Sequence, residues 1–312
     1  MMVYSSTFDM AYVEFGNSSY FLIRQLIWTL IGVGALVVLA RIDYRMWERW
    51  AVLIMAGILL LLAVVFFAGS KKFGAQRWLF NGSIQPSEVT KIAVIIYIAA
   101  WVTSKGEKIR QVSYGLLPFA ILIGLVTGLI LLQRDLSTAL LIAVTALIMF
   151  FFAGADLIQL AASMVFCAAT FVMMIVREPY RMDRVLAFLS PDADPGGSSY
   201  QIHQALIALA SGGIIGQGLG ASRQKFGYVP AVHTDTIVAV LGEELGLIGC
   251  LVLLGLFILL AYRGFKIALE ASDAFGTILA AGLTCSLVLQ ALINMMVVTA
   301  TVPYAGVPLP FI

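Results

Sequence analysis

Charged residues are scarce in this chain. Only 12% of its 312 residues are Asp, Glu, Lys or Arg, about half of the ~25% found in an ordinary soluble domain. Hydrophobic residues make up 61% of the chain, and this composition excludes an ordinary soluble globule. The 19 Lys and Arg residues nearly balance the 17 Asp and Glu residues. The net charge of +2 therefore creates no field that would gather nucleic acid, and a nucleic-acid partner is excluded as well.

Cysteine and histidine are also rare, with three and two residues respectively. Cys167, Cys250 and Cys285 lie inside apolar runs and have no His or Cys neighbour at a ligand spacing. The sequence therefore supports neither a disulfide framework nor a zinc cluster. We interpret the three cysteines as small hydrophobic residues.

Long apolar runs occupy most of the sequence. A hydrocarbon layer about 30 Å thick requires roughly 20 apolar residues in a helix, and backbone groups in lipid must be satisfied within the segment. We therefore predict an all-α polytopic integral membrane protein in which residues 1–312 form a single membrane domain. The predicted transmembrane helices span about 21–40, 51–69, 87–103, 114–133, 137–153, 157–176, 236–262 and 274–300.

The distribution of Lys and Arg predicts the orientation. Loops 41–50, 104–113 and 263–273 carry eight positive charges on one side, against five in the short loops and helix ends of the other side. Cytoplasmic loops are enriched in Lys and Arg, so the long segment 177–235 is predicted to be extracytoplasmic. The first twenty residues lack a basic start and an adequate apolar core, which argues against a cleavable signal peptide.

The segment 177–235 is too long for a simple connection and is a functional candidate. Its first part, REPYRMDRVLAFLSP, alternates charged and apolar residues as an interfacial helix would. After the chain-breaking PDADPGGSS, YQIHQALIALASGG has apolar residues at helical spacing. We expect interfacial or re-entrant helices over a cavity.

Glu88 and Lys91 are ionisable residues at the start of the predicted helix 87–103. Their spacing places them on one helix face, where they can pair, and Gln85 and Pro86 precede them. One interpretation is a structural ion pair between helices. The other is that Lys91, together with Arg77 in the preceding loop, presents positive charge to an anionic ligand.

Three further carboxylates lie near or within predicted spans. Asp135, in QRDLSTA, is expected to cap the helix that begins near Ser137. Glu243 and Glu244, in GEELG, lie about 12 Å along a spanning helix that starts near Asp235. Adjacent carboxylates at that depth cannot both face lipid, so we expect one of them to face a polar cavity or a basic partner.

The run SGGIIGQGLGASRQKFGYVPAVHTD, from Ser211 to Asp235, combines glycines with Ser222, Arg223 and Lys225. Glycines permit close backbone approach, and the hydroxyl and cationic groups are donors that a phosphate would accept. A plain low-complexity loop is the alternative. A P-loop is rejected, because no strand precedes the run and no GK[ST] follows it.

Asp235 follows His233 and lies where the next spanning helix begins. It could simply cap that helix. Alternatively, a carboxylate at the mouth of a cavity can accept a proton from a hydroxyl or bind a divalent cation, and His233 could tune its charge.

Taken in order, these residues resemble the SEDS family of shape, elongation, division and sporulation proteins, which includes RodA and FtsW. The resemblance covers nearly the whole chain and looks closer to the FtsW branch. It is carried by GAQRW at 74–78, SIQPSEVTK at 83–91, QRDLSTA at 133–139, YQIHQALIALASGG through VPAVHTDTIVAVLGEELG at 200–246 and GVPLPFI at 306–312.

The resemblance implies a peptidoglycan glycosyltransferase in cell division or cell shape. Family members have ten spanning helices and polymerise lipid II at the outer face of the bacterial cytoplasmic membrane, together with a class B penicillin-binding protein and other divisome or elongasome proteins. This sequence departs from the family at both ends, as a fragment lacking most of the first and all of the last helix would. Arg134 and Ser137 also replace the family's usual Pro and Gly.

By resemblance, Asp235 matches the carboxylate regarded as essential in the family's large outer loop. It is the candidate catalytic base or ligand of Mg²⁺ or Mn²⁺, and no organic cofactor is expected. The candidate substrate-binding residues are Arg77, Gln85, Glu88, Lys91, Ser211, Ser222, Lys225, His233 and Glu243.

Two alternatives remain open. A flippase for a lipid-linked precursor would use Glu88, Lys91, Glu243 and Glu244 as a polar path and could lose Asp235 without loss of transport. A non-catalytic division scaffold would tolerate loss of all these residues as long as the fold survives.

Overall fold

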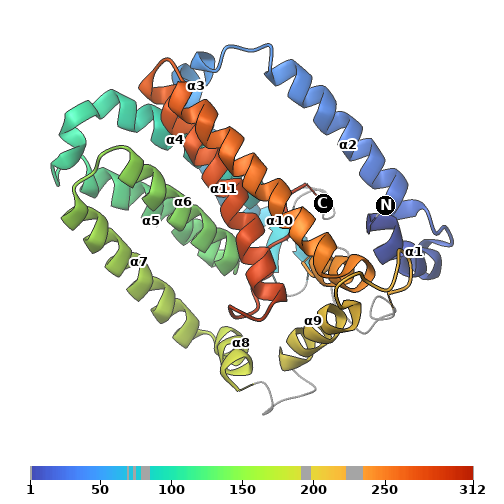
Figure 1. The fold of residues 1–312 in the computed structure, drawn as a ribbon. Helices are drawn as coiled ribbons and strands as arrows, with labels where there is room; N and C mark the ends of the chain where they lie inside the picture. The colour runs from blue at the N-terminus through green and yellow to red at the C-terminus, as the bar shows by residue number, and fades with distance from the viewer. Residues whose placement is uncertain are drawn as a thin grey trace. The chain divides into compact units, whose positions relative to one another are not determined.

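The computed structural model describes residues 2–68, 70–72, 75–78, 85–190, 198–222 and 235–311 (Figure 1). Helices dominate these residues, which confirms the predicted helical class. Six of the described helices are long and apolar enough to cross a membrane, and α5 and α6 are apolar helices of 17 residues each. The apolar helices are α2 (Tyr20–Leu39), α3 (Arg45–Ala68), α4 (Pro86–Lys105), α5 (Leu116–Leu132), α6 (Leu136–Phe152), α7 (Leu157–Arg177), α10 (Ile237–Glu270) and α11 (Ala274–Val298).

Shorter elements connect them. The helices are α1 (Met2–Phe15), the 3₁₀ helix η2 (Gly106–Arg110), α8 (Pro179–Leu189) and α9 (Ser198–Gly212). The strands β1 (Ser70–Lys72) and β2 (Ala75–Trp78) form an antiparallel hairpin in which Ser70 lies opposite Trp78. Arg77 was expected in a loop and lies instead in β2 of this hairpin.

The chain divides into two compact units. The first comprises Met1–Ile42, Ile175–Leu259 and Gln290–Ile312, and the second comprises Asp43–Met174 and Leu260–Leu289. The division falls inside α7, α10 and α11. The two units therefore share these helices in sequence.

The core of the second unit lies among α3, α4, α5 and α6. Helices α3 and α6 each pack against both α4 and α5. In Figure 1, α5 and α6 form a helical hairpin that lies next to α4. Leu62, Ile98 and Ile130 are fully buried there. The rings of Phe119 and Phe150 stack with their centroids 4.4 Å apart. These contacts form one continuous apolar core.

Asp273 anchors the start of α11 within the second unit. Its Oδ1 accepts a hydrogen bond from the amide of Gly276 at 2.6 Å, and its Oδ2 accepts from Nε of Arg45 at 3.0 Å and from the Tyr44 hydroxyl at 2.9 Å. The Gly276 amide, followed by the Arg45 and Tyr44 donors, lowers the pKa of Asp273. The carboxylate is therefore charged at neutral pH and joins α3 to α11.

Helix α10 is broken at Gly246, in the first unit. Gly246 has φ +67° and ψ −163°, a conformation essentially restricted to glycine. The loop after α9 lies against the break: the amide of Gln217 donates to the carbonyl of Glu243, and the amide of Leu247 donates to the carbonyl of Gly213, both at 3.0 Å. The window 236–262 was expected to be one continuous helix and is not, because loop groups replace the helical hydrogen bonds at this point.

Candidate active site around Asp235

Asp235 lies in the turn immediately before α10 and is partly buried. Its backbone carbonyl accepts a hydrogen bond from Nδ2 of Asn294 on α11 at 2.8 Å. Its Oδ2 lies 3.5 Å from the hydroxyl of Tyr304, which donates to it. Within the first unit, α11 therefore holds the backbone of Asp235, and the segment that follows α11 contacts its carboxylate.

The segment after α11 is held by amide side chains. Asn294 donates a second hydrogen bond to the carbonyl of Val307 at 2.8 Å, and Gln290 donates to the carbonyl of Pro308 at 2.9 Å. A Cβ atom on Gly306 would lie 3.0 Å from Oδ2 of Asp235. The backbone therefore approaches the carboxylate so closely that only glycine fits there without displacement.

Arg184 on α8 contacts the same cluster. Its guanidinium lies 5.0 Å from the ring centroid of Tyr304 and 4.5 Å from that of Tyr180. It also donates to the Tyr304 carbonyl at 3.3 Å and to the Tyr180 hydroxyl. Arg184 thus connects the predicted interfacial helix to the surroundings of Asp235.

Tyr304 keeps its proton in this environment. Its side chain is buried against Ile202 of α9 and Val297 of α11. Burial, followed by the negative charge of Asp235, raises the pKa of the Tyr304 hydroxyl well above its ordinary value. The hydroxyl is therefore neutral at physiological pH and acts as a donor to the carboxylate.

Asn294, Tyr304 and Arg184 were not predicted from the sequence. The available signals were the two amides, Gln290 and Asn294, four residues apart in the apolar run of α11, and the position of Tyr304 two residues before GVPLPFI. Arg184 lies in the segment predicted to be an interfacial helix, but no sequence pattern places it near Asp235.

The side chains of four predicted site residues lie outside the described part of the structure, and a fifth, Ser211, is exposed. Arg223, Lys225 and His233 fall outside the described residues, and only the backbone of Arg77 is described, in β2. Ser211 is exposed at the end of α9, where its hydroxyl donates to the carbonyl of Ala208.

Both glutamates of GEELG are buried in the first unit, with exposures of 1% for Glu243 and 0% for Glu244. Ser222 donates a hydrogen bond to Oε2 of Glu243 at 2.5 Å, and Ser5 of α1 donates to Oε1 of Glu244 at 2.5 Å. Two hydroxyl donors from distant parts of the chain therefore meet the first half of α10. This brings Ser222 and Glu243, both candidate site residues, into direct contact.

Gln85 belongs to a buried polar cluster in the second unit. Its Nε2 donates to Oδ2 of Asp135 at 2.9 Å, and the hydroxyl of Ser87 donates to the same oxygen at 3.1 Å. Oδ1 of Asp135 accepts from the amide of Thr138 at 3.2 Å. The predicted capping role of Asp135 is confirmed, and the same carboxylate also ties α4 to α6.

Replacing Asp135 with alanine should destabilise the second unit by about 2–3 kcal/mol, because the change removes a helix cap and leaves buried donors without an acceptor. The apparent melting temperature in detergent measures this loss. Asp156 provides the matched control, since its Oδ1 accepts from the amide of Ile158 at an exposed position. The same substitution there should cost at most about 1 kcal/mol; equal losses at both sites would contradict the role assigned to Asp135.

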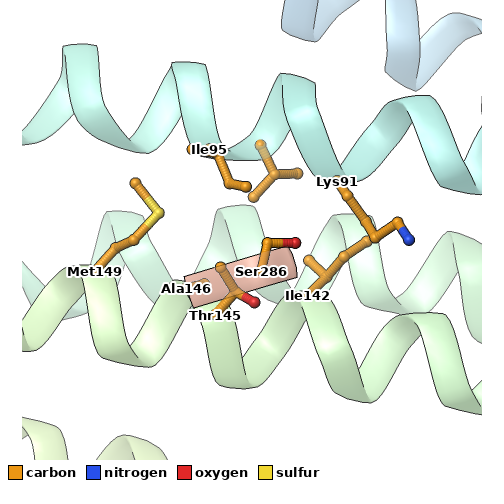
Figure 2. A pocket seen from close by; sticks show the side chains of 8 residues that line it. Lys91, Ile95, Ile142, Thr145, Ala146, Met149 and Ser286 are labelled. Atoms are coloured by element: carbon orange, nitrogen blue, oxygen red, sulfur yellow. The ribbon is translucent and has the colours of Figure 1, made fainter. Parts of the chain in front are cut away.

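Glu88 and Lys91 form the predicted ion pair, with 2.7 Å between Oε2 and Nζ. Lys91 is 8% exposed and also lines a narrow pocket between α4, α6 and α11 (Figure 2). Thr145 and Ser286 supply hydroxyl groups to this pocket, and among the described atoms Oγ1 of Thr145 has no hydrogen-bond partner. The pairing of Glu88 with Lys91 is confirmed, but it joins two residues of the same helix, α4, and not two helices as that interpretation held. A ligand role for Lys91 stays a prediction.

The described residues contain no group of three or more His, Cys, Asp or Glu side chains placed to hold a metal ion. Substrate oxygens could complete the coordination of a divalent cation at Asp235. Mg²⁺ is commonly held in this way, by one or two carboxylates together with substrate phosphates, and a lone carboxylate such as Asp235 fits that arrangement.

Comparison with known proteins identifies the family. The family model described as "Cell cycle protein", for FtsW, RodA and SpoVE, matches residues 1–312. The chain is 44% identical over its whole length to "Probable peptidoglycan glycosyltransferase FtsW" of Trichlorobacter lovleyi, covering 83% of that protein. It is 38% identical over its whole length to "Stage V sporulation protein E" of Bacillus subtilis, covering 86% of that protein.

Solved structures show the same fold. One chain from "Structural coordination of polymerization and crosslinking by a peptidoglycan synthase complex" is 27% identical, with a TM-score of 0.76 over 99% of this chain and 89% of that one. The rod shape determining protein RodA of Thermus thermophilus is 24% identical, with a TM-score of 0.69 over 99% of this chain and 85% of that one. Together with its apolar helices, these matches show that the chain belongs to the FtsW, RodA and SpoVE family of cell cycle proteins and is a multi-pass membrane protein.

Proposed function

We propose that this chain is a peptidoglycan glycosyltransferase that polymerises lipid II into glycan strands, in cell division or cell shape. The observation that carries the proposal is the position of Asp235 at the start of an apolar helix, where Tyr304 donates to its carboxylate and Asn294 donates to its backbone carbonyl. The names of the relatives support the reaction, since FtsW proteins 42% to 44% identical to this chain are called probable peptidoglycan glycosyltransferases.

The reaction makes defined demands on the site. The 4-hydroxyl oxygen of the acceptor sugar forms a bond to the anomeric carbon of the donor, and the bond from that carbon to the lipid diphosphate breaks. The bonding electron pair leaves with the diphosphate oxygen. Asp235 takes the hydroxyl proton, and positive charge stabilises the departing oxygens.

The predicted cations Arg77, Lys91, Arg223 and Lys225 are the proposed contacts to the diphosphate or to substrate carboxylates. In the second unit Lys91 is charge-balanced by Glu88, so we assign Glu88 the role of orienting Lys91. Ser222 is likewise oriented by Glu243. The remaining proposed substrate-binding residues are Gln85, Ser211 and His233.

Chelation should lower polymerisation. Asp235 would hold Mg²⁺ or Mn²⁺ together with the diphosphate oxygens, and a bound cation would neutralise charge on the leaving group. An excess of EDTA is expected to lower the rate at least tenfold, and added Mg²⁺ should restore it. A rate that is unchanged by EDTA would remove the cation from the proposal and leave Asp235 as base alone.

The proposed location of the site follows from the lipid tails of the substrate. Polyprenyl chains stay in the bilayer while their head groups react, which suits a site where a helix meets the interface. We place this site at the outer face of the bacterial cytoplasmic membrane, with 177–235 extracytoplasmic, as the Lys and Arg distribution predicts. A class B penicillin-binding protein is the proposed partner, which agrees with the peptidoglycan synthase complex found among the structural matches.

Polymerisation in detergent tests the proposal against transport. The purified chain, with a penicillin-binding partner whose transpeptidase is inactivated, is incubated with labelled lipid II and Mg²⁺, and the products are separated by size. A muramidase-sensitive ladder of glycan chains is expected, because bond formation needs no sealed membrane. Folded protein without a ladder, together with lipid II translocation in proteoliposomes, would replace the proposal with a flippase.

A further inference from the structure

Two aromatic rings lie close to Arg184 in the first unit. Its guanidinium is 4.5 Å from the ring centroid of Tyr180, four residues earlier on its own helix, and 5.0 Å from that of Tyr304 in the segment after α11. The planar guanidinium also donates to the Tyr304 carbonyl. A guanidinium suits both tasks, since it is flat enough to stack and presents several donors in a fixed plane.

Tyr304 lies between this guanidinium and the candidate base. It is 9% exposed and packs against Ile202 and Val297, while its hydroxyl donates to Oδ2 of Asp235. Because apolar contacts and Arg184 hold the ring, the hydroxyl oxygen has a fixed position, 3.5 Å from Oδ2 of Asp235. The carboxylate of Asp235 therefore meets a donor that is held in place.

We infer that Arg184 and Tyr304 are positioning residues: Arg184 fixes the ring and backbone of Tyr304, and the Tyr304 hydroxyl orients the carboxylate of Asp235 for proton abstraction. This inference rests on the proposed glycosyltransferase function. It makes the interfacial helix α8 part of the catalytic apparatus, although none of its side chains needs to touch the substrate. A base must be held within hydrogen-bond reach of the proton it takes, so its orientation governs the chemical step.

The test measures kcat and KM for lipid II polymerisation in the whole chain with its penicillin-binding partner. Tyr304→Phe keeps the ring and removes the hydroxyl, and should lower kcat about fivefold, the effect of one hydrogen bond. Arg184→Gln should lower kcat by about fivefold at most, since Arg184 acts through the Tyr304 hydroxyl and its loss cannot cost more than the loss of that hydroxyl. Both variants should leave KM within about twofold of the parent, because neither residue contacts the substrate.

Two further variants separate positioning from charge and from folding. Arg184→Lys keeps the charge but loses the flat stack, so it should resemble Arg184→Gln. Arg177→Gln removes an exposed positive charge at the end of α7 and should leave kcat unchanged. A full rate in Arg184→Lys would overturn the proposal, because charge alone would then suffice.

The double variant tests whether the two residues act in series. If Arg184 works through Tyr304, the double variant should lose no more than the larger single loss, about fivefold, whereas independent roles would multiply to about 25-fold and overturn the proposal. Failures are distinguishable. A parent that forms no glycan refutes the glycosyltransferase function, and with it the positioning role; an active parent whose variants match Arg177→Gln refutes the positioning role alone.

Discussion

Asp235→Asn is expected to lower the rate of glycan polymerisation by at least about a hundredfold, the lower end of what a general base contributes. Asparagine has nearly the same shape and can still accept the hydrogen bond from Tyr304, but it cannot take a proton at neutral pH. The rate is measured with labelled lipid II and the penicillin-binding partner. The melting temperature should change little, since Asp235 is only partly buried.

Asp183 supplies the matched control. It is an exposed carboxylate on α8 in the same unit, and Asp183→Asn should keep at least half of the parent's rate. If Asp235→Asn also retained a third or more of the parent's rate, Asp235 would not be the base, and the transport interpretation would gain weight because a flippase has no need of this carboxylate.

Gly246→Ala is expected to destabilise the protein by about 3 kcal/mol or more, because alanine is strained in this backbone conformation and has no space. Its Cβ would lie 2.4 Å from the amide nitrogen of Gly216 and 2.5 Å from the carbonyl oxygen of Ile214. Both are backbone atoms of the loop that pairs with the broken helix, so neither can move without breaking that pairing. The apparent melting temperature in detergent should fall by roughly 5–10 °C.

Gly255, nine residues later on α10, is the control for this substitution. No described atom lies within 4 Å of the position its Cβ would occupy, and alanine is favoured over glycine in a helix by up to about 1 kcal/mol. Gly255→Ala should therefore be at least as stable as the parent. If Gly246→Ala were equally stable, α10 would be continuous in the membrane and the break would have no structural role.

The sequence was sufficient to predict the helical class, because runs of about 20 apolar residues have few alternatives in a membrane. It was not sufficient to predict the break at Gly246. GEELG lies inside a long apolar run, and a single glycine is compatible with a helix. The break depends on a loop about thirty residues earlier that supplies replacement hydrogen bonds, and hydropathy carries no information about such pairing.

The candidate site was predictable only where its contacts join residues that are close in sequence. Local signals identified Asp135 as a cap and Glu88 with Lys91 as a pair, because these interactions join residues three positions apart. Arg184 and Tyr304 are 120 residues apart, and each is unremarkable in its own segment. Only the fold brings them to Asp235.

The most direct test of the proposed mechanism counts the glycosidic bonds that form in detergent solution. The chain and its inactivated penicillin-binding partner are given labelled lipid II, and the glycosidic bonds formed are compared with the lipid diphosphate released. The proposed mechanism predicts one diphosphate released for each new bond in the parent, and neither product above background in Asp235→Asn. Folded parent protein that yields neither product, or an Asp235→Asn variant that yields both at the parent's rate, would contradict it.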